Sequence, residues 1–162
     1  ADHFCGRRTE LDALESAILE PSDLPKLVLL MGAQGVGKTA LVHTFAHKHR
    51  HDFTGGVFWL NWSKYTGFQS AVFDLCCQIG LVDFDFAATP LASSFAAAVA
   101  TLQGQDTKYL LCFDGIDTTG AADALADLLK CPGARMQGTV LAISSQMDMR
   151  RKLPCVDTDV VE

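Results

Sequence analysis

The residues with the clearest chemical purpose lie in one short segment, residues 32–39, which reads Gly-Ala-Gln-Gly-Val-Gly-Lys-Thr. The segment matches the phosphate-binding pattern G-x-x-x-x-G-K-[S/T] at every fixed position. Its glycines allow backbone conformations that a side chain forbids, so several N–H groups can point at one anion. Lys38 can place a positive charge on the β- and γ-phosphates, and the hydroxyl of Thr39 can bind Mg²⁺. The residues expected to contact a nucleotide are Gly32, Ala33, Gln34, Gly35, Val36, Gly37, Lys38, Thr39 and Ala40.

A phosphate site of this kind needs an acidic residue at the end of a neighbouring strand. Asp114 fits, because it follows four apolar residues at positions 110–113. We expect it to hold Mg²⁺ through the water shell that this ion keeps, although an aspartate that begins a turn is the plain alternative. Asp117 lies three residues further on and could orient or deprotonate an attacking water, or be a solvated turn residue. The predicted catalytic residues are Lys38, Asp114 and Asp117, and the predicted metal ligands are Thr39 and Asp114.

Alternating strands and helices are expected to position these residues. Apolar runs predict strands at residues 26–31, 56–61, 108–113 and 139–143, with a further candidate at 155–161. Helical spacing of apolar residues predicts helices at 9–20, 38–49, 67–79, 91–102 and 121–130, with Thr9 capping the first and a linker at 21–25 after it. This order predicts one three-layer α/β domain with a mostly parallel sheet and helices on both faces. The glycine-rich segment then follows a strand and opens a helix, which favours a phosphate loop over an ordinary turn with an exposed lysine.

Composition narrows the class of partner. The chain has 162 residues, of which 49% are hydrophobic, and a formal net charge of -6. The acidic balance disfavours nucleic acid as a partner, because phosphate contacts need clustered Lys and Arg. No apolar stretch reaches the roughly 18 residues that cross a bilayer, and no signal pattern opens the sequence, so we expect a cytoplasmic protein with no membrane partner. Six cysteines form no C-x-x-C pair and are expected to be buried thiols.

The base of the nucleotide is inferred by elimination. The N-K-x-D segment with which GTPases read guanine is absent from the sequence. Residues 117–120 do match the short D-x-x-G pattern of GTPases, but four residues are weak evidence. The expected cofactors are therefore ATP or ADP together with Mg²⁺.

Taken together, these segments resemble the signal-transducing STAND ATPases, which include the NB-ARC and NACHT branches. The resemblance is carried by residues 4–11 (Phe-Cys-Gly-Arg-Arg-Thr-Glu-Leu), 32–39, 57–61 (Val-Phe-Trp-Leu-Asn) and 110–117, and more weakly by 138–146. It implies a five-stranded sheet of order 5-1-4-3-2, in which strand 139–143 lies between strand 26–31 and the strand that ends at Asp114. It also implies a segment at 1–25 on the adenine side, in front of an NTPase core at 26–162.

The resemblance further implies a regulatory switch with slow, Mg-dependent ATP hydrolysis, in which ADP holds a closed form and ATP permits self-association. The expected protein partners are further copies of the chain and other protein domains of a signalling complex. Adenine would lie against Phe4, Cys5, Gly6 and Arg7. Gln146 stands where an arginine often senses the γ-phosphate, and Gly115 stands where NB-ARC proteins have a second acid. Family members continue into a small helical domain and a winged-helix domain, so we expect a piece of a larger multidomain protein.

Three alternatives stay open at this point. Gly115 and Gln146 favour a catalytically weak scaffold that the nucleotide only stabilises. The opening segment also occurs in AAA+ proteins of the origin-recognition type, which would act on DNA. A small-molecule kinase is disfavoured, because no acceptor-binding lid with paired arginines is visible in the sequence.

Overall fold

The computed structural model describes residues 6–20, 26–62, 68–81, 85, 88–103, 107–130, 138–146, 148–149 and 158–161, the last range as backbone only. The helices are α1 (Arg8–Leu19), α2 (Lys38–Lys48), α3 (Phe68–Gln78), α4 (Leu91–Gln103) and α5 (Thr119–Leu129). The strands are β1 (Lys26–Met31), β2 (Gly56–Asn61), β3 (Tyr109–Asp114), β4 (Thr139–Ser144) and β5 (Thr158–Val161). The linker predicted at 21–25 lies outside the described residues.

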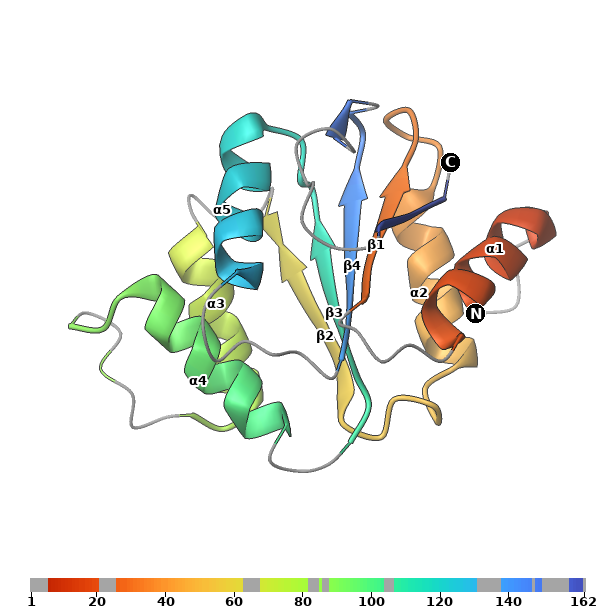
Figure 1. Ribbon diagram of the computed structural model, residues 1–162. Coiled ribbons are helices and arrows are strands. Elements are labelled where there is room, and N and C mark those ends of the chain that lie inside the picture. The colour runs from red at the N-terminus through yellow and green to blue at the C-terminus, as the bar shows by residue number, and fades with distance from the viewer. Residues whose placement is uncertain are drawn as a thin grey trace.

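The five strands form one sheet in the order β2-β3-β4-β1-β5, and each neighbouring pair is parallel (Figure 1). This is the predicted order, and the predicted α/β fold class is confirmed. Parallel neighbours require crossover connections, which explains why strands and helices alternate along the chain. The carboxyl ends of all the strands therefore meet at one edge of the sheet, where functional residues of such folds gather.

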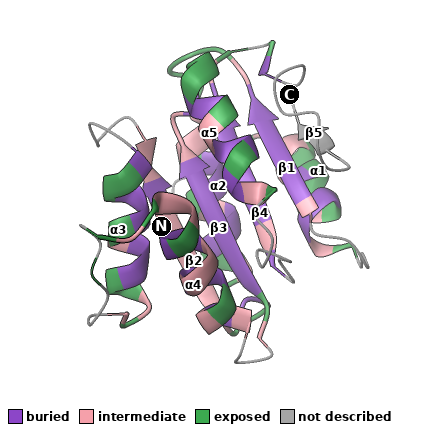
Figure 2. Ribbon diagram, turned by 60° about the vertical axis from the view of Figure 1, so that its left-hand side comes forward, coloured by how far each residue is buried: buried purple, intermediate pink, exposed green. Residues whose placement is uncertain are grey.

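Helices cover both faces of the sheet and bury it between two apolar cores. One core packs α3, α4 and α5 against the sheet, and the other packs α1 and α2 against its opposite face (Figure 1). Residues of β1 alternate between them, since Leu27 and Leu29 join the first core whereas Val28 and Leu30 join the second. Burial on both faces explains the unbroken apolar runs of β1 and β3, which are buried along almost their whole length (Figure 2).

The ends of several elements differ from the predicted ones, because caps and tertiary partners set them. Thr9 is not the cap of α1: the helix begins at Arg8, and its N-cap is Arg7 in the left-handed region, with φ 53° and no side-chain cap. Helix α5 begins two residues earlier than predicted, since the side chain of Thr118 accepts a hydrogen bond from the backbone N–H of Ala121 at 3.1 Å. Strand β3 extends one residue further than predicted and includes Asp114.

Polar contacts tie α1 to the rest of the domain. The ammonium of Lys26, at the start of β1, donates to the carbonyl oxygens of Ala17 at 3.0 Å and Glu20 at 2.7 Å. A cation at this position satisfies carbonyls that the last turn of a helix leaves unpaired. Glu15 on α1 accepts a hydrogen bond from Lys48 at the end of α2, which lowers the pKa of the Glu15 carboxyl.

The cysteines follow the prediction only in part. Cys76 and Cys112 are buried, and burial raises the pKa of both thiols, that of Cys76 to about 11. The prediction is wrong for Cys77, which is exposed on the outer face of α3. Cys5, Cys131 and Cys155 lie outside the described residues. Across the described ranges, no group of three or more His, Cys, Asp or Glu side chains could hold a metal ion, and no helix is long and apolar enough to cross a membrane.

Candidate functional site

The loop between β1 and α2 has the conformation that its glycines predict. Gly35 has φ 80° and Gly37 has φ 92°, in the region that only glycine adopts at little cost. No heavy atom would lie within 4 Å of a Cβ at either position, so backbone conformation rather than lack of space requires glycine there. Gly37 is the N-cap of α2 and has no side-chain cap, which leaves the positive end of the helix directed at the loop.

Lys38 folds back over this loop from the first position of α2. Its ammonium donates to the carbonyl oxygens of Gly32 at 2.8 Å and Ala33 at 2.9 Å. These two contacts hold the charge at the mouth of the loop rather than in solvent. A charged donor in this position suits an anionic group that enters the loop.

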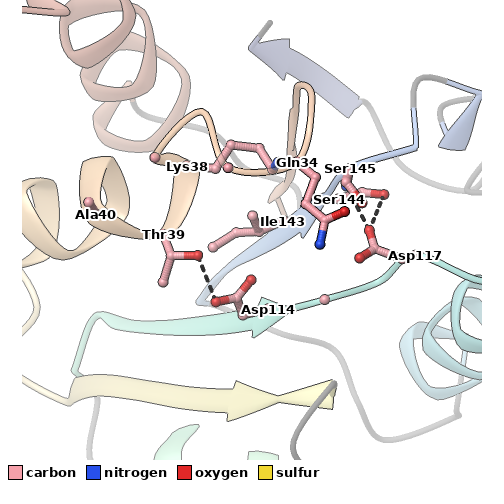
Figure 3. A pocket seen from close by; sticks show the side chains of 12 residues that line it. Gln34, Lys38, Thr39, Ala40, Asp114, Asp117, Ile143, Ser144 and Ser145 are labelled. Atoms are coloured by element: carbon pink, nitrogen blue, oxygen red, sulfur yellow. Dashed lines mark hydrogen bonds between the residues drawn. The ribbon is translucent and has the colours of Figure 1, made fainter.

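Thr39 and Asp114 are brought together from distant parts of the chain. Thr39 lies in the first turn of α2, and Asp114 is the last residue of β3. The hydroxyl of Thr39 donates to Oδ2 of Asp114 at 2.9 Å (Figure 3). A hydroxyl and a carboxylate side by side supply the hard oxygen atoms that Mg²⁺ prefers.

One cavity of about 490 Å³ joins these residues to the end of β4. Its lining comes from the loop, from the first turn of α2 and from the carboxyl ends of β3 and β4 (Figure 3). The lining residues are Gln34, Gly35, Gly37, Lys38, Thr39, Ala40, Asp114, Gly115, Asp117, Ile143, Ser144 and Ser145. The structure thus brings together all three residues that the sequence predicts as catalytic.

Asp117 faces the end of β4. Its Oδ1 accepts a hydrogen bond from the backbone N–H of Ser145 at 2.6 Å and another from the hydroxyl of Ser144 at 3.2 Å (Figure 3). Sequence reasoning did not single out these two serines. The available signal was their position directly after an apolar strand that was expected to lie beside the strand ending at Asp114.

The structure also explains the glycine that follows Asp114. Gly115 has φ 86°, a conformation that side chains rarely adopt. Its N–H and that of Ile116 both donate to the carbonyl oxygen of Ile143, at 3.2 and 3.0 Å. The turn sends Ile116 into the core, where it is fully buried. A second acid at position 115 would therefore have to adopt a strained backbone.

Several predicted contacts are not assembled around the cavity. Phe4 and Cys5 lie outside the described residues, whereas Gly6 and Arg7 precede α1 and are not part of the lining. Gln146 is exposed and is also not part of the lining. Within the loop itself, the lining does not include Gly32, Ala33 or Val36. The roles predicted for these residues stay predictions.

The parallel sheet, the glycine loop that caps α2 and the Thr39–Asp114 pair define the fold and site of a P-loop NTPase. A family model described as an AAA ATPase domain matches residues 3–143, and the chain belongs to this family.

Solved structures share this fold at low sequence identity. Cdc6p from Pyrobaculum aerophilum matches with a TM-score of 0.72 and 14% identity, over 99% of this chain and 46% of that chain. The ORC2 protein of Aeropyrum pernix in its ADPNP–ADP complexes matches with a TM-score of 0.66 and 15% identity, over 91% of this chain and 43% of that chain. A STAND protein with a tetratricopeptide repeat sensor from Pyrococcus horikoshii matches with a TM-score of 0.60 and 14% identity, over 99% of this chain and 23% of that chain.

The chain therefore spans less than half the length of each of these structures. No curated protein sequence matches it at a significant level.

Proposed function

We propose that this chain is the ATP- and ADP-binding domain of a regulatory ATPase of the STAND type. In this proposal it hydrolyses ATP slowly with Mg²⁺, and the bound nucleotide controls its self-association. The observation that carries the proposal is the 2.9 Å hydrogen bond between Thr39 and Asp114, which lies in the same cavity as Lys38 and the open end of α2. Membership of the AAA ATPase domain family and the fold shared with a STAND protein support it.

Each residue has a physical role in this proposal. The phosphates lie in the loop, where the N–H groups at the start of α2 and the Lys38 ammonium bind them. The oxygens of Thr39 and Asp114 fit Mg²⁺, which when bound supplies positive charge to the phosphate oxygens. Asp117 orients the attacking water and accepts its proton, while the bond from the γ-phosphorus to ADP breaks and inorganic phosphate is released. ORC2, solved in ADPNP–ADP complexes, supports an adenine nucleotide as the ligand.

Isothermal titration of the chain with Mg·ADP and with Mg·ATP tests the binding step. Lys38→Ala removes charge-assisted hydrogen bonds worth about 1.5–3 kcal/mol, so the Kd should rise roughly 10- to 150-fold. Lys108→Ala is the matched control, because Lys108 directly precedes β3, at the opposite end of that strand from Asp114. Equal affinities of the parent and Lys38→Ala would refute the phosphate site.

Hydrolysis and assembly need their own measurements. Phosphate release should depend on Mg²⁺ and should be lost in Asp114→Asn, which keeps the shape of the side chain but removes its charge. Sedimentation of the chain with ADP and with a non-hydrolysable ATP analogue should give a larger species only with the analogue. One species under both conditions would refute the switch and leave the nucleotide site standing.

A catalytically weak scaffold is the second candidate. The exposed position of Gln146 favours it, because this side chain stands where the family pattern often has a γ-phosphate sensor and is not among the residues that line the cavity. Tight binding of Mg·ATP without phosphate release would establish this candidate.

A third candidate is an origin-recognition-like ATPase that acts on DNA, and the fold shared with ORC2 and Cdc6p favours it. The formal net charge of -6 opposes it. DNA binding that weakens steeply with salt would revive this candidate.

A further inference from the structure

The end of β4 holds Asp117 through a small hydrogen-bond network. The hydroxyl of Ser144 donates a hydrogen bond to Oδ1 of Asp117 at 3.2 Å and accepts one from the backbone N–H of Gln146 at 3.0 Å. The backbone N–H of Ser145 donates to the same Oδ1 at 2.6 Å (Figure 3). Two donors on one carboxylate oxygen fix the rotation of the whole carboxyl group. No hydrogen bond to the other oxygen, Oδ2, is found within the described part of the chain.

Ser144 is the side chain on which this network depends. It is only 1% exposed, and a buried hydroxyl has to use its single hydrogen on a partner. Ser94, the other buried polar residue among those described, donates its hydroxyl hydrogen to the carbonyl oxygen of Pro90, the residue directly before its own helix α4. Ser144 instead links two segments that are 27 residues apart in the sequence.

The position of Ser144 in the sheet connects this network to the phosphate loop. Ser144 pairs with Met31, the last residue of β1, and the loop begins at the next residue. On the other side, the turn after Asp114 is bonded to Ile143, the residue before Ser144. The end of β4 therefore touches both the strand that carries the loop and the turn that carries Asp117.

We propose that Ser144 is a positioning residue for the hydrolytic reaction. Its hydroxyl orients Asp117 so that Oδ2 can take the proton of the attacking water, and it ties that orientation to the end of the phosphate-loop strand. Gln146 contributes to this network through its backbone N–H. The inference rests on the proposed function, because it assigns a part in the same reaction.

Ser144→Ala, Ser144→Thr and the control Ser94→Ala test the inference. In Ser144→Ala, kcat for ATP should fall about 10-fold or more, the usual effect of removing an outer contact of a functional group. KM and the Kd for Mg·ADP should stay within about twofold, because the phosphate loop is unchanged. Ser144→Thr keeps the hydroxyl and should restore kcat, and Ser94→Ala should turn over at the parent rate.

Amide hydrogen exchange gives a readout that does not depend on turnover. The amide of Gln146 should exchange faster in Ser144→Ala, because it loses its acceptor, and should recover its protection in Ser144→Thr. Unchanged exchange of this amide would overturn the network itself.

The kinetic outcomes separate the two proposals. If the parent chain hydrolyses ATP and Ser144→Ala has an unchanged kcat, the role of Ser144 is overturned and the proposed function stands. Ser144→Thr that is as slow as Ser144→Ala, with an unchanged melting temperature, also overturns it. A parent chain that binds Mg·ADP but releases no phosphate overturns the hydrolytic part of the proposed function, and the role of Ser144 with it.

Discussion

Substitution of Gly115 tests whether backbone conformation, rather than chemistry, selects the residue after Asp114. Gly115 has φ 86°, where a Cβ costs about 1–2 kcal/mol. Gly120 lies within α5, outside the positive-φ region, and a Cβ there would meet no atom within 4 Å. Alanine at position 120 should therefore stabilise the fold by about 0.4–1 kcal/mol through the unfolded state. The free energies of unfolding of Gly115→Ala and Gly120→Ala should differ by about 1.4–3 kcal/mol, the first lying below that of the parent and the second above it.

Urea unfolding at constant m value measures this difference directly. For a chain of this size, it corresponds to melting temperatures about 3–12 °C apart. Gly115→Asn should lose less stability than Gly115→Ala, because asparagine tolerates the left-handed region of backbone conformation. Gly115→Asp, which restores the acid of the NB-ARC pattern, should also lose stability. If Gly115→Ala is as stable as Gly120→Ala, backbone strain is not the reason for glycine at this position.

Three further predictions concern the rest of the domain. Lys26→Met should lower the free energy of unfolding by about 1 kcal/mol, because it leaves the last carbonyls of α1 without their cation; an unchanged urea midpoint would contradict this. Iodoacetamide should modify Cys77 in the native protein and spare Cys112 until unfolding, as peptide mass mapping would show. The hydrogen bond from Lys48 lowers the pKa of the Glu15 carboxyl. This ion pair should therefore stabilise the fold by at most about 1 kcal/mol above pH 4.5, and the stabilisation should fade as the pH falls through the lowered pKa of Glu15. The stability difference between the parent and Glu15→Gln should therefore shrink at low pH, and a constant difference would refute the ion pair.

The sequence predicted the interior of each element better than its ends. Continuous apolar runs identify β1 and β3, because burial on both faces leaves no polar position to break the run. The start of α5 was missed, because it depends on one side-chain cap from Thr118, a residue that looks like part of a turn. The N-cap of α1 was missed for the opposite reason, since Thr9 is a good capping residue by type but the chain enters the helix through Arg7.

The residues of the site also differ in how well the sequence predicts them. The loop was predictable because residues 32–39 contain both its geometry and its chemistry. Asp114 was predictable from one additional rule, that the ends of neighbouring parallel strands meet. The pairing of Asp117 with Ser144 follows from neither, because it depends on the register of β3 against β4.

That register pairs Asp114 with Ile143, so the turn after Asp114 runs beside the residues that follow Ile143. A shift of two residues would preserve every apolar face, since side chains alternate with a period of two, yet it would move Ser144 away from Asp117. Hydrophobic patterning therefore cannot select the contact, whereas the two hydrogen bonds from the turn to the Ile143 carbonyl can. In this structure the side chain that contacts Asp117 is that of Ser144, the last residue of β4. It lies two positions before Gln146, where the family pattern often has a phosphate sensor.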